Sequence, residues 1–403
     1  MNNSKSKLFV KLLVGYIFLL PIIFIRPIIL IRFGISHSTR IGHFALWIDL
    51  YLSSLSFGIG RPKTKFIDIW CFDAPTANKF LEKKWKEIIN VKKYWVVSSI
   101  ISCIKKNPAL HDHLIPHYDT TVVGTNIGTS MIHEYFDMNI ELKTDPLLSF
   151  SNSEMQEGEN KLLELGIENH SFICFHSRDS KYLKSKFPNT DWSYHDYRDV
   201  DINIFSQAIT ELSKRKYKCI RMGKNTNKGV DFNVKGVIDY SKHQETSDFL
   251  DIFLSAHCKF FISTGSGIGD MARLFRRPLM CTNLAPVYSI YTSGAKIVIF
   301  KLLWMNKEKR YMTFSEIFSS DLFKVDSSCL FKDYDVALHC NSKEDIADAA
   351  IEMDDRLNGV WKESEESVIL QEKFWNIFPV QPDSTKKRTR IGASFLKKYS
   401  YLL

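Results

Sequence analysis

The sequence predicts an α/β protein of two domains, with a doubly wound parallel sheet in its C-terminal half. The chain has 403 residues, 45% of them hydrophobic, so it exceeds one ordinary domain and can form sizeable cores. From residue 171 onward, short apolar runs alternate with segments of helical periodicity. The apolar runs show almost no polar alternation, which is typical of strands covered by helices on both faces.

In this C-terminal half, predicted strands and helices largely alternate along the chain. We expect strands at 172–176, 218–222, 236–240, 259–263 and 279–281, and helices at 202–214, 247–256 and 268–275. A helix at 153–165, with Ser153 and Gln156 as a capping box and Gly166 as its stop, precedes this series. Helices at 342–357 and 365–378 follow it, and a basic run at 386–390 precedes the last residues.

The N-terminal half has a weaker version of the same pattern. Strands are expected at 66–72 and 94–97, with a helix at 76–89 whose N-cap is Thr76. Residues 114–148 show no clear periodicity, so no element is predicted there.

The first forty residues favour contact with a membrane. Residues 8–35 are dominated by Leu, Ile, Val and Phe, but the cleanest stretch, 12–25, is shorter than the ~20 residues of a straight span. Pro21 and Pro27 would kink a helix, so a re-entrant or interfacial anchor is favoured over a span, with a buried helix pair as the alternative. No acid precedes Asp49, which suits anionic lipid at the cytoplasmic face of an inner membrane.

These patterns divide the chain into four parts. They are a membrane anchor at 1–36, an N-terminal α/β domain at 37–168, a Rossmann-like domain at 169–341, and C-terminal helices at 342–403 that pack back on the N-terminal domain.

Composition limits the chemistry. The formal net charge of +9 favours anionic partners, but no nucleic-acid motif, zinc-ligand spacing or nucleophilic triad is present. The eight cysteines form no Cys-x-x-Cys pair, and those in apolar strand-like runs, such as Cys174, Cys219 and Cys258, are expected to be buried reduced thiols.

A Gly- and Ser-rich loop at 263–267 is the first candidate binding site. Ligands of open parallel sheets bind beyond the carboxyl ends of strands, and this loop follows an apolar strand and opens a helix. Its amides and hydroxyls can face a phosphate, whereas a capped tight turn is the structural alternative. The residues concerned are Ser263, Thr264, Gly265, Ser266 and Gly267.

Basic residues follow two other strands. Arg178 can pair bidentately with a diphosphate, and Arg198 in the following aperiodic stretch can join it. Arg221 could reach the same phosphates, while Gly223 permits a turn. A surface ion-pair network around Arg178 and a structural role for Arg221 are the alternatives.

Two further groups of residues are candidates for a metal site or for a catalytic base. Asp199 and Asp201 resemble an Asp-x-Asp metal site, but Asp201 directly precedes a helix and is more simply its N-cap, so no metal is expected. His43 lies where a helix begins after the membrane segment and could deprotonate an acceptor hydroxyl, or serve structure alone.

The sequence resembles a family of bacterial glycosyltransferases associated with surface-polysaccharide synthesis. The matching stretches are 40–43, 175–179, 197–201, 219–223, 239–241, 251–254, 260–267 and 278–286. The Arg178 region and the 263–267 loop are also distantly similar to the donor site of fucosyltransferases. The resemblance implies a GT-B architecture: two Rossmann-like domains with a cleft between them, an acceptor site mainly in the first and a nucleotide-sugar site in the second.

This resemblance implies transfer of a sugar from a nucleotide-sugar donor to a lipid-linked or growing saccharide in capsule, O-antigen or lipopolysaccharide synthesis, with no cofactor. Inner-membrane lipid is the further expected partner, and nucleic acid is not. A non-catalytic membrane adaptor of the same fold, which binds saccharide or nucleotide, is the rival. A dinucleotide dehydrogenase is disfavoured, because no acidic residue stands at the expected distance after a Gly-rich first strand turn.

Overall fold

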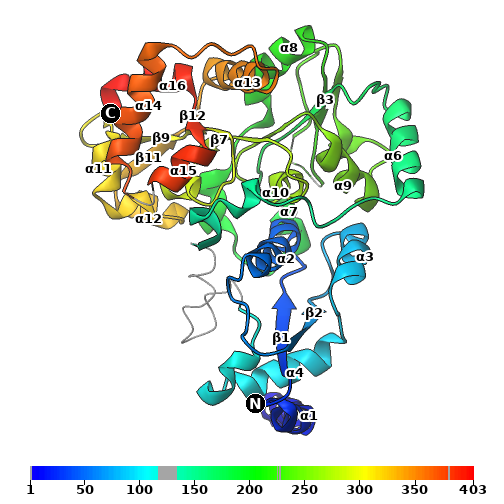
Figure 1. Cartoon of the computed structure of the whole chain (residues 1–403). Helices are drawn as coiled ribbons and strands as arrows, with labels where there is room; N and C mark the ends of the chain where they lie inside the picture. Colours follow the sequence, from blue (N-terminus) through cyan, green and yellow to red (C-terminus); the bar gives the residue numbers. More distant parts are fainter. Residues whose placement is uncertain (1, 117–133, 225, 227, 380–381) are drawn as a thin grey trace. The chain divides into compact units, whose positions relative to one another are not determined.

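The computed structural model describes residues 2–116, 134–224, 226, 228–379 and 382–403, with only the backbone described at 2–8 and 382 (Figure 1). Residues 117–133, within the stretch 114–148 that has no predicted element, therefore lie outside the described residues. The chain forms two compact units, Met1–Leu148 and Ser149–Leu403.

The second unit contains the predicted doubly wound sheet. Its strand order is β12-β8-β7-β6-β3-β4-β5, and neighbouring strands pair in parallel. The strands are β3 (Phe172–His176), β4 (Lys218–Arg221), β5 (Val237–Ile238), β6 (Phe261–Ser263), β7 (Leu279–Leu284), β8 (Ile297–Phe300) and β12 (Arg390–Ile391). The prediction of a parallel α/β sheet is thus confirmed.

Helices cover both faces of this sheet. α8 packs against α13, and α9 packs against α10, and Figure 1 shows the two pairs on opposite sides of the strands. The longer helices are α6 (Asn152–Glu164), α8 (Ser206–Lys214), α9 (Asp248–His257), α13 (Lys343–Leu357) and α14 (Glu365–Ile377). The shorter ones are α7 (Lys181–Lys186), α10 (Gly269–Leu274), α11 (Phe314–Phe318), α12 (Ser328–Asp333), α15 (Pro382–Arg388) and α16 (Ala393–Lys398).

Local caps explain where several helices begin. Ser247, predicted as the first residue of a helix, is the N-cap of α9 and accepts a hydrogen bond from the Leu250 amide. The predicted capping box of α6 is wrong by two residues, because Ser151 and Glu154 form it. Both pairs fit the same spacing, but the earlier serine lets the helix begin at Asn152, two residues sooner than Ser153 would.

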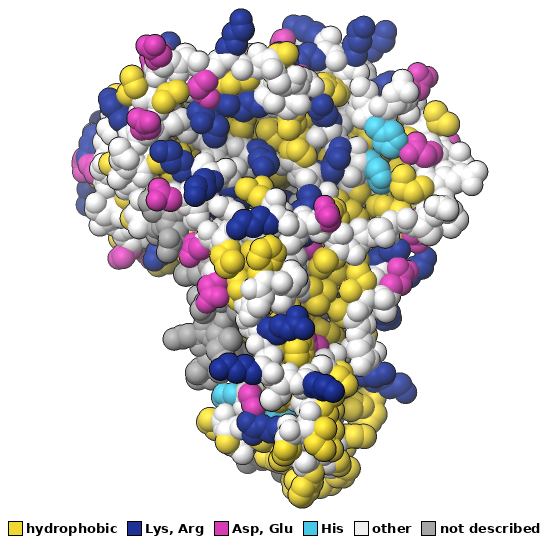
Figure 2. Space-filling view, viewed as in Figure 1, with side chains coloured by type: hydrophobic (Ala, Val, Ile, Leu, Met, Phe, Trp, Pro, Cys, Tyr) yellow, Lys and Arg dark blue, Asp and Glu magenta, His cyan; other side chains and the backbone are white. Residues whose placement is uncertain are grey.

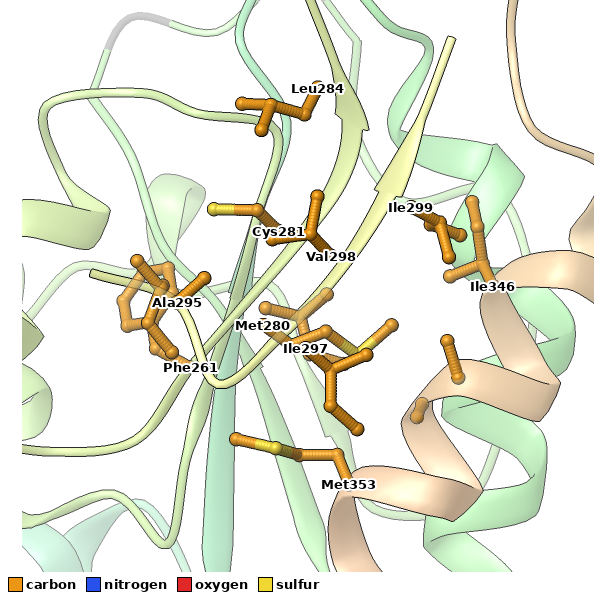
Figure 3. Close-up of a cluster of buried hydrophobic side chains, with 14 of the residues drawn as sticks. Phe261, Met280, Cys281, Leu284, Ala295, Ile297, Val298, Ile299, Ile346 and Met353 are labelled. Carbon is orange, nitrogen blue, oxygen red and sulfur yellow. The ribbon is translucent and has the colours of Figure 1, made fainter. Parts of the chain in front are cut away.

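The core of the second unit lies between the sheet and its helices. Met280 and Cys281 of β7 lie beside Ile297 and Val298 of β8, and Figure 3 shows Ile346 and Met353 of α13 approaching these strands. Met353, the longest of these apolar side chains on α13, is 1% exposed. Burial of such side chains from both faces is the main stabilising contribution to the sheet.

Residues 342–403, for which the sequence predicts helices packing back on the N-terminal domain, belong to the second unit. β12 extends the large sheet beside β8, and α13 packs against α8. The sequence also missed a small antiparallel sheet of order β10-β9-β11. Its strands are β9 (Leu302–Met305), β10 (Arg310–Tyr311) and β11 (Val336–His339).

The first unit is a smaller α/β arrangement. Its sheet has two parallel strands, β1 (Leu30–Ser36) and β2 (Phe66–Phe72), within the described part of the chain, fewer than the predicted Rossmann-like domain would have. Its helices include α2 (Ile41–Ser56), α3 (Lys79–Ile88) and α4 (Tyr94–Ile104). Within this sheet, buried Arg32 of β1 is held by its register partner Asp68 of β2, with Nε to Oδ1 at 2.7 Å, and by Tyr51.

Two predictions in this unit are wrong. Residues 94–97, predicted as a strand, form the first turn of α4. The N-cap of α3 is Asn78, which accepts from the Leu81 amide, whereas Thr76 donates its hydroxyl to Glu82. A helix forms here instead of a strand, because the apolar residues of α4 continue with helical spacing to Ile104 and pack on α1.

The N-terminal segment forms α1 (Asn2–Ile25), and β1 then occupies the end of the predicted 1–36 anchor. The predicted boundary at residue 36 is thus wrong, since 30–36 is a strand paired with β2. Within the part of the chain that the structure describes, no helix is both long and apolar enough to cross a membrane.

Candidate functional site

The main candidate site lies where the strand order of the large sheet reverses. From β3 the chain adds β4 and β5 on one side and then crosses to place β6 on the other side of β3. At the carboxyl ends of these two strands, His176 is paired in register with Ser263. Such a topological switch point is the usual ligand site of open parallel sheets.

Arg178 follows β3 and lies at this switch point. Its backbone amide donates to Thr264 Oγ1 at 2.9 Å, so the two predicted motifs are joined directly. Its Nη1 donates to the His195 carbonyl at 3.1 Å and forms an ion pair with Asp199. The residue is 7% exposed, and its Nη2 is buried with no hydrogen-bond partner among the described residues.

A buried guanidinium with an unsatisfied donor is costly unless a ligand accepts from it. Burial lowers the pKa of Arg178 from its ordinary value, while Asp199 opposes that change. Burial likewise raises the pKa of Asp199, against the effect of Arg178. Because the ion pair uses Nη1, the Nη2 group of Arg178 can still donate a hydrogen bond to an additional anion.

The 263–267 loop supplies small polar groups beside Arg178. The Ser263 hydroxyl lies 3.2 Å from that of Ser266 and accepts from the Ser266 amide at 3.3 Å. Gly265 has φ +68°, a conformation that favours glycine, and its carbonyl accepts from Arg198 Nη2. Arg198 is thus placed against the loop, and its contact with a diphosphate stays a prediction.

The helix after this loop is shorter than the predicted 268–275. α10 has six residues and begins at Gly269, so little dipole is available at its N-terminus. The groups able to meet an anion are therefore the loop amides, the hydroxyls of Ser266 and Thr264, and the two arginines.

Arg221 and Gly223 lie one strand away, after β4. Arg221 is 1% exposed, and its Nη1 donates to both carboxylate oxygens of Asp239 at 3.1 Å and to Ser241 Oγ at 2.8 Å. This pairing supports the structural role that the sequence left open, and a phosphate contact of Arg221 stays a prediction. Gly223 has φ +133°, and a Cβ there would lie 3.1 Å from His176 Nδ1.

Two residues that were not predicted from the sequence also lie beside the candidate site. His176 Nδ1 donates to the Met222 carbonyl at 2.9 Å, and burial, reinforced by Arg221 and Arg178, lowers its pKa to about 4. Lys301 directly follows β8, and its Nζ donates to the carbonyl of Asp199 at 3.1 Å. Burial lowers the pKa of Lys301. Lys301 could have been noticed in the sequence, because it is a charged residue directly after an apolar run.

Each carboxylate of the Asp-x-Asp pair is engaged by other groups of the chain. Asp201 accepts from the Asn203 amide at 3.0 Å, which confirms the predicted N-cap, and pairs with Lys228 at 2.6 Å. Asp199 is engaged with Arg178. Across the described residues, no group of three or more His, Cys, Asp or Glu side chains is placed to hold a metal ion.

The first unit has its own cluster at the carboxyl ends of β1 and β2. His37, which the sequence analysis did not select, lies with Nδ1 3.2 Å from Asp73 Oδ2, and the Ser38 amide donates to Asp73 Oδ1 at 3.1 Å. The predicted base His43 lies in the first turn of α2, with its ring stacked on Trp47 at a centroid distance of 4.0 Å. The two histidine rings are 6.4 Å apart.

Asp73 is the charged member of this cluster. Burial raises its pKa, but hydrogen bonds from His37 and Ser38 and the His37 charge outweigh that effect, so the net pKa is lowered. A carboxylate that accepts from Nδ1 of an imidazole fixes the tautomer in which Nε2 is the basic nitrogen. The geometry therefore favours His37 over His43 as an oriented base.

A scan against models of known protein families finds no match, and a search of curated proteins also finds none. Among solved structures, the chain is similar to the glycosyl transferase family 9 protein of Veillonella parvula, at 10% identity over 82% of this chain and 96% of that one, with a TM-score of 0.45. It is also similar to the ADP-heptose lipopolysaccharide heptosyltransferase II of E. coli, at 13% identity over 62% and 84%, with a TM-score of 0.34.

A third similar structure is the dodecameric, iron-containing glycosyltransferase TibC of enterotoxigenic E. coli, at 13% identity over 63% of this chain and 58% of that one, with a TM-score of 0.31. All three TM-scores are below 0.5. The function proposed below is therefore argued from the site and not from these similarities.

Proposed function

We propose that this chain is a glycosyltransferase that moves a glycosyl group from a nucleotide-sugar donor to a saccharide acceptor. The acceptor would be a lipid-linked or growing saccharide of a bacterial surface polysaccharide, at the cytoplasmic face of the inner membrane. The observation that carries the proposal is Arg178, a buried arginine at the switch point whose Nη2 has no hydrogen-bond partner among the described residues.

The leaving group of such a donor is a nucleoside diphosphate. As the bond between the anomeric carbon and the phosphate oxygen breaks, the oxygen keeps the electron pair and negative charge grows on it. Arg178 and Arg198, fixed by Asp199 and Gly265, are donors already oriented before the reaction. Preorganised donors of this kind stabilise developing charge without reorganisation. We expect neither a metal ion nor a covalent enzyme intermediate.

The acceptor hydroxyl needs a base. In the first unit, His37 has the required chemistry, because Asp73 accepts from Nδ1 and leaves Nε2 as the proton acceptor. Such a dyad also stabilises the imidazolium that forms once the proton is taken. We therefore assign the base to His37, and keep His43, stacked on Trp47, as the residue to compare with it.

The test is a screen of nucleotide sugars by thermal shift, followed by a turnover assay on those that bind. A donor that binds only the folded chain raises the unfolding midpoint. We expect one nucleotide class to do so, and Arg178→Ala to lose both the shift and turnover. Donor binding without consumption, in the presence of saccharide acceptors, would instead identify the non-catalytic adaptor. No shift with any nucleotide sugar would refute the proposed donor site.

A further inference from the structure

From Phe9 to Ile25, α1 is apolar on nearly all sides, with Lys11 as the charged exception, but the described chain covers only one side. α1 packs along α4, where Leu19 is fully buried. The approach is close at Gly15, since a Cβ there would lie 2.4 Å from both the Ser99 carbonyl oxygen and Cys103 Sγ. This face accounts for a continuous stripe of α1 residues that join Val97 and its neighbours on α4 in one hydrophobic cluster.

The opposite side of α1 is exposed and equally apolar. Phe24 is 82% exposed and Ile17 59%. The other exposed apolar side chains of α1 and the turn after it are Phe9, Val10, Leu13, Tyr16, Phe18, Leu20, Ile25 and Ile28. A helix that is hydrophobic all round is normally covered on all sides, and a contiguous apolar patch marks an interaction surface.

The surface continues onto the start of α4. Tyr94 and Trp95 are 47% and 56% exposed there. Their rings combine an apolar body with one polar group, which suits the boundary between lipid chains and water. Figure 2 shows the hydrophobic side chains gathered over α1 and α4.

Cations border this apolar surface. Lys92 and Lys93 precede α4, and Lys105 and Lys106 follow it, all four exposed. Lys and Arg side chains stand around the hydrophobic area in Figure 2. Near an anionic bilayer, each such cation strengthens binding by about fivefold. A two-fold contact between copies of the chain would instead bring these lysines against their own equivalents.

We propose that the exposed face of α1, together with Tyr94 and Trp95, lies in the surface of an anionic lipid bilayer, with α1 parallel to the membrane plane. Apolar side chains would enter the boundary of the acyl chains while the lysines contact phosphate headgroups. The inference is independent of the proposed transferase activity.

The test is co-sedimentation of the full chain with vesicles of phosphatidylcholine, alone or mixed with phosphatidylglycerol. We expect the chain to pellet with the mixed vesicles and much less with phosphatidylcholine alone, and high salt to release it. The double variant Ile17→Asp with Phe24→Asp should remain in the supernatant. The matched control is Leu163→Asp with Val360→Asp, two side chains of the second unit that are each 63% exposed, and it should pellet normally.

A second variant keeps the test decisive if the aspartates disturb folding. Lys92→Glu with Lys93→Glu leaves the apolar face intact and should weaken binding by more than tenfold, given about fivefold for each charge removed. Equal pelleting of both double variants and the unaltered chain would overturn the proposal. So would equal binding to neutral and mixed vesicles, or self-association that Ile17→Asp with Phe24→Asp disperses in a chain that binds no vesicles.

Discussion

Replacement of Arg178 by alanine should abolish turnover while leaving the fold intact. The side chain lies at the switch point of the large sheet and bears a buried donor without a partner in the described structure. In the proposed mechanism, its removal takes away a preoriented cation next to the leaving diphosphate. Loss of one such donor costs about 10²- to 10³-fold in kcat, or ~2.7–4 kcal/mol of transition-state stabilisation.

The cost to stability should be smaller. Removal of one partner of a fully buried ion pair costs ~3–5 kcal/mol. Asp199, the partner left behind, has a side chain that is 28% exposed, so water can solvate it in the variant. We therefore expect a loss below that range. Arg178→Lys retains the charge but cannot serve Asp199 and a phosphate with a forked group, so its turnover should be intermediate.

Turnover of the binding nucleotide sugar and the midpoint of thermal unfolding, measured on the same preparations, check this prediction. Arg215→Ala is the matched control, because Arg215 is also paired with a carboxylate, that of Asp354 at 2.7 Å. It precedes β4 and so lies at the amino ends of the strands, away from the candidate site. It should retain near-normal turnover. Turnover of Arg178→Ala within about threefold of the unaltered chain would refute the role of Arg178 as a transition-state donor.

Three further predictions concern the base, the core and acid stability. His37→Ala should lower turnover by about 10²- to 10⁴-fold without changing the thermal shift by the donor, whereas His43→Ala should retain most activity; the reverse order would return the base to His43. Gly158→Ala should destabilise the chain by about 1–3 kcal/mol in urea denaturation, because its Cβ would lie 2.1 Å from the Phe253 ring, and unchanged stability would contradict that packing. Burial, reinforced by nearby arginines, lowers the pKa of His176 from 6.5 to about 4, so the unfolded chain takes up a proton that the folded chain refuses, and stability should fall as the pH drops through that range. His176→Gln should reduce this dependence in denaturation series at several pH values, and an identical pH slope would contradict it.

The architecture of the second unit was readable from the sequence, since its central strands are uninterrupted apolar runs. Cys219 and Ile220, for example, are fully buried in β4 and pair with strands on both sides. Propensity alone failed where tertiary packing decides. Residues 94–97 are β-formers, yet they begin a helix, because α4 buries Val97 and Ile101 against α1.

The candidate site was only partly readable. Arg178 and the 263–267 loop could be selected because both follow apolar runs, and strand ends carry ligands in parallel sheets. The ion pair of Arg221 with Asp239 could not be predicted from the sequence, because it depends on the register between β4 and β5. His37 was missed because β1 resembles a membrane segment in sequence, so its end was not recognised as a strand end.

The hydrogen bond from the Arg178 amide to Thr264 Oγ1 joins residues separated by 86 positions in the chain. A contact of this sequence separation incurs its loop-closure entropy before it contributes stability. The two parts of the proposed phosphate site are therefore too far apart in the chain to assemble locally, since β3, β4 and β5 are made before β6. They come together where β6 pairs with β3, so this site depends on that strand pairing. Hydrogen exchange of the Arg178 amide would report that pairing directly.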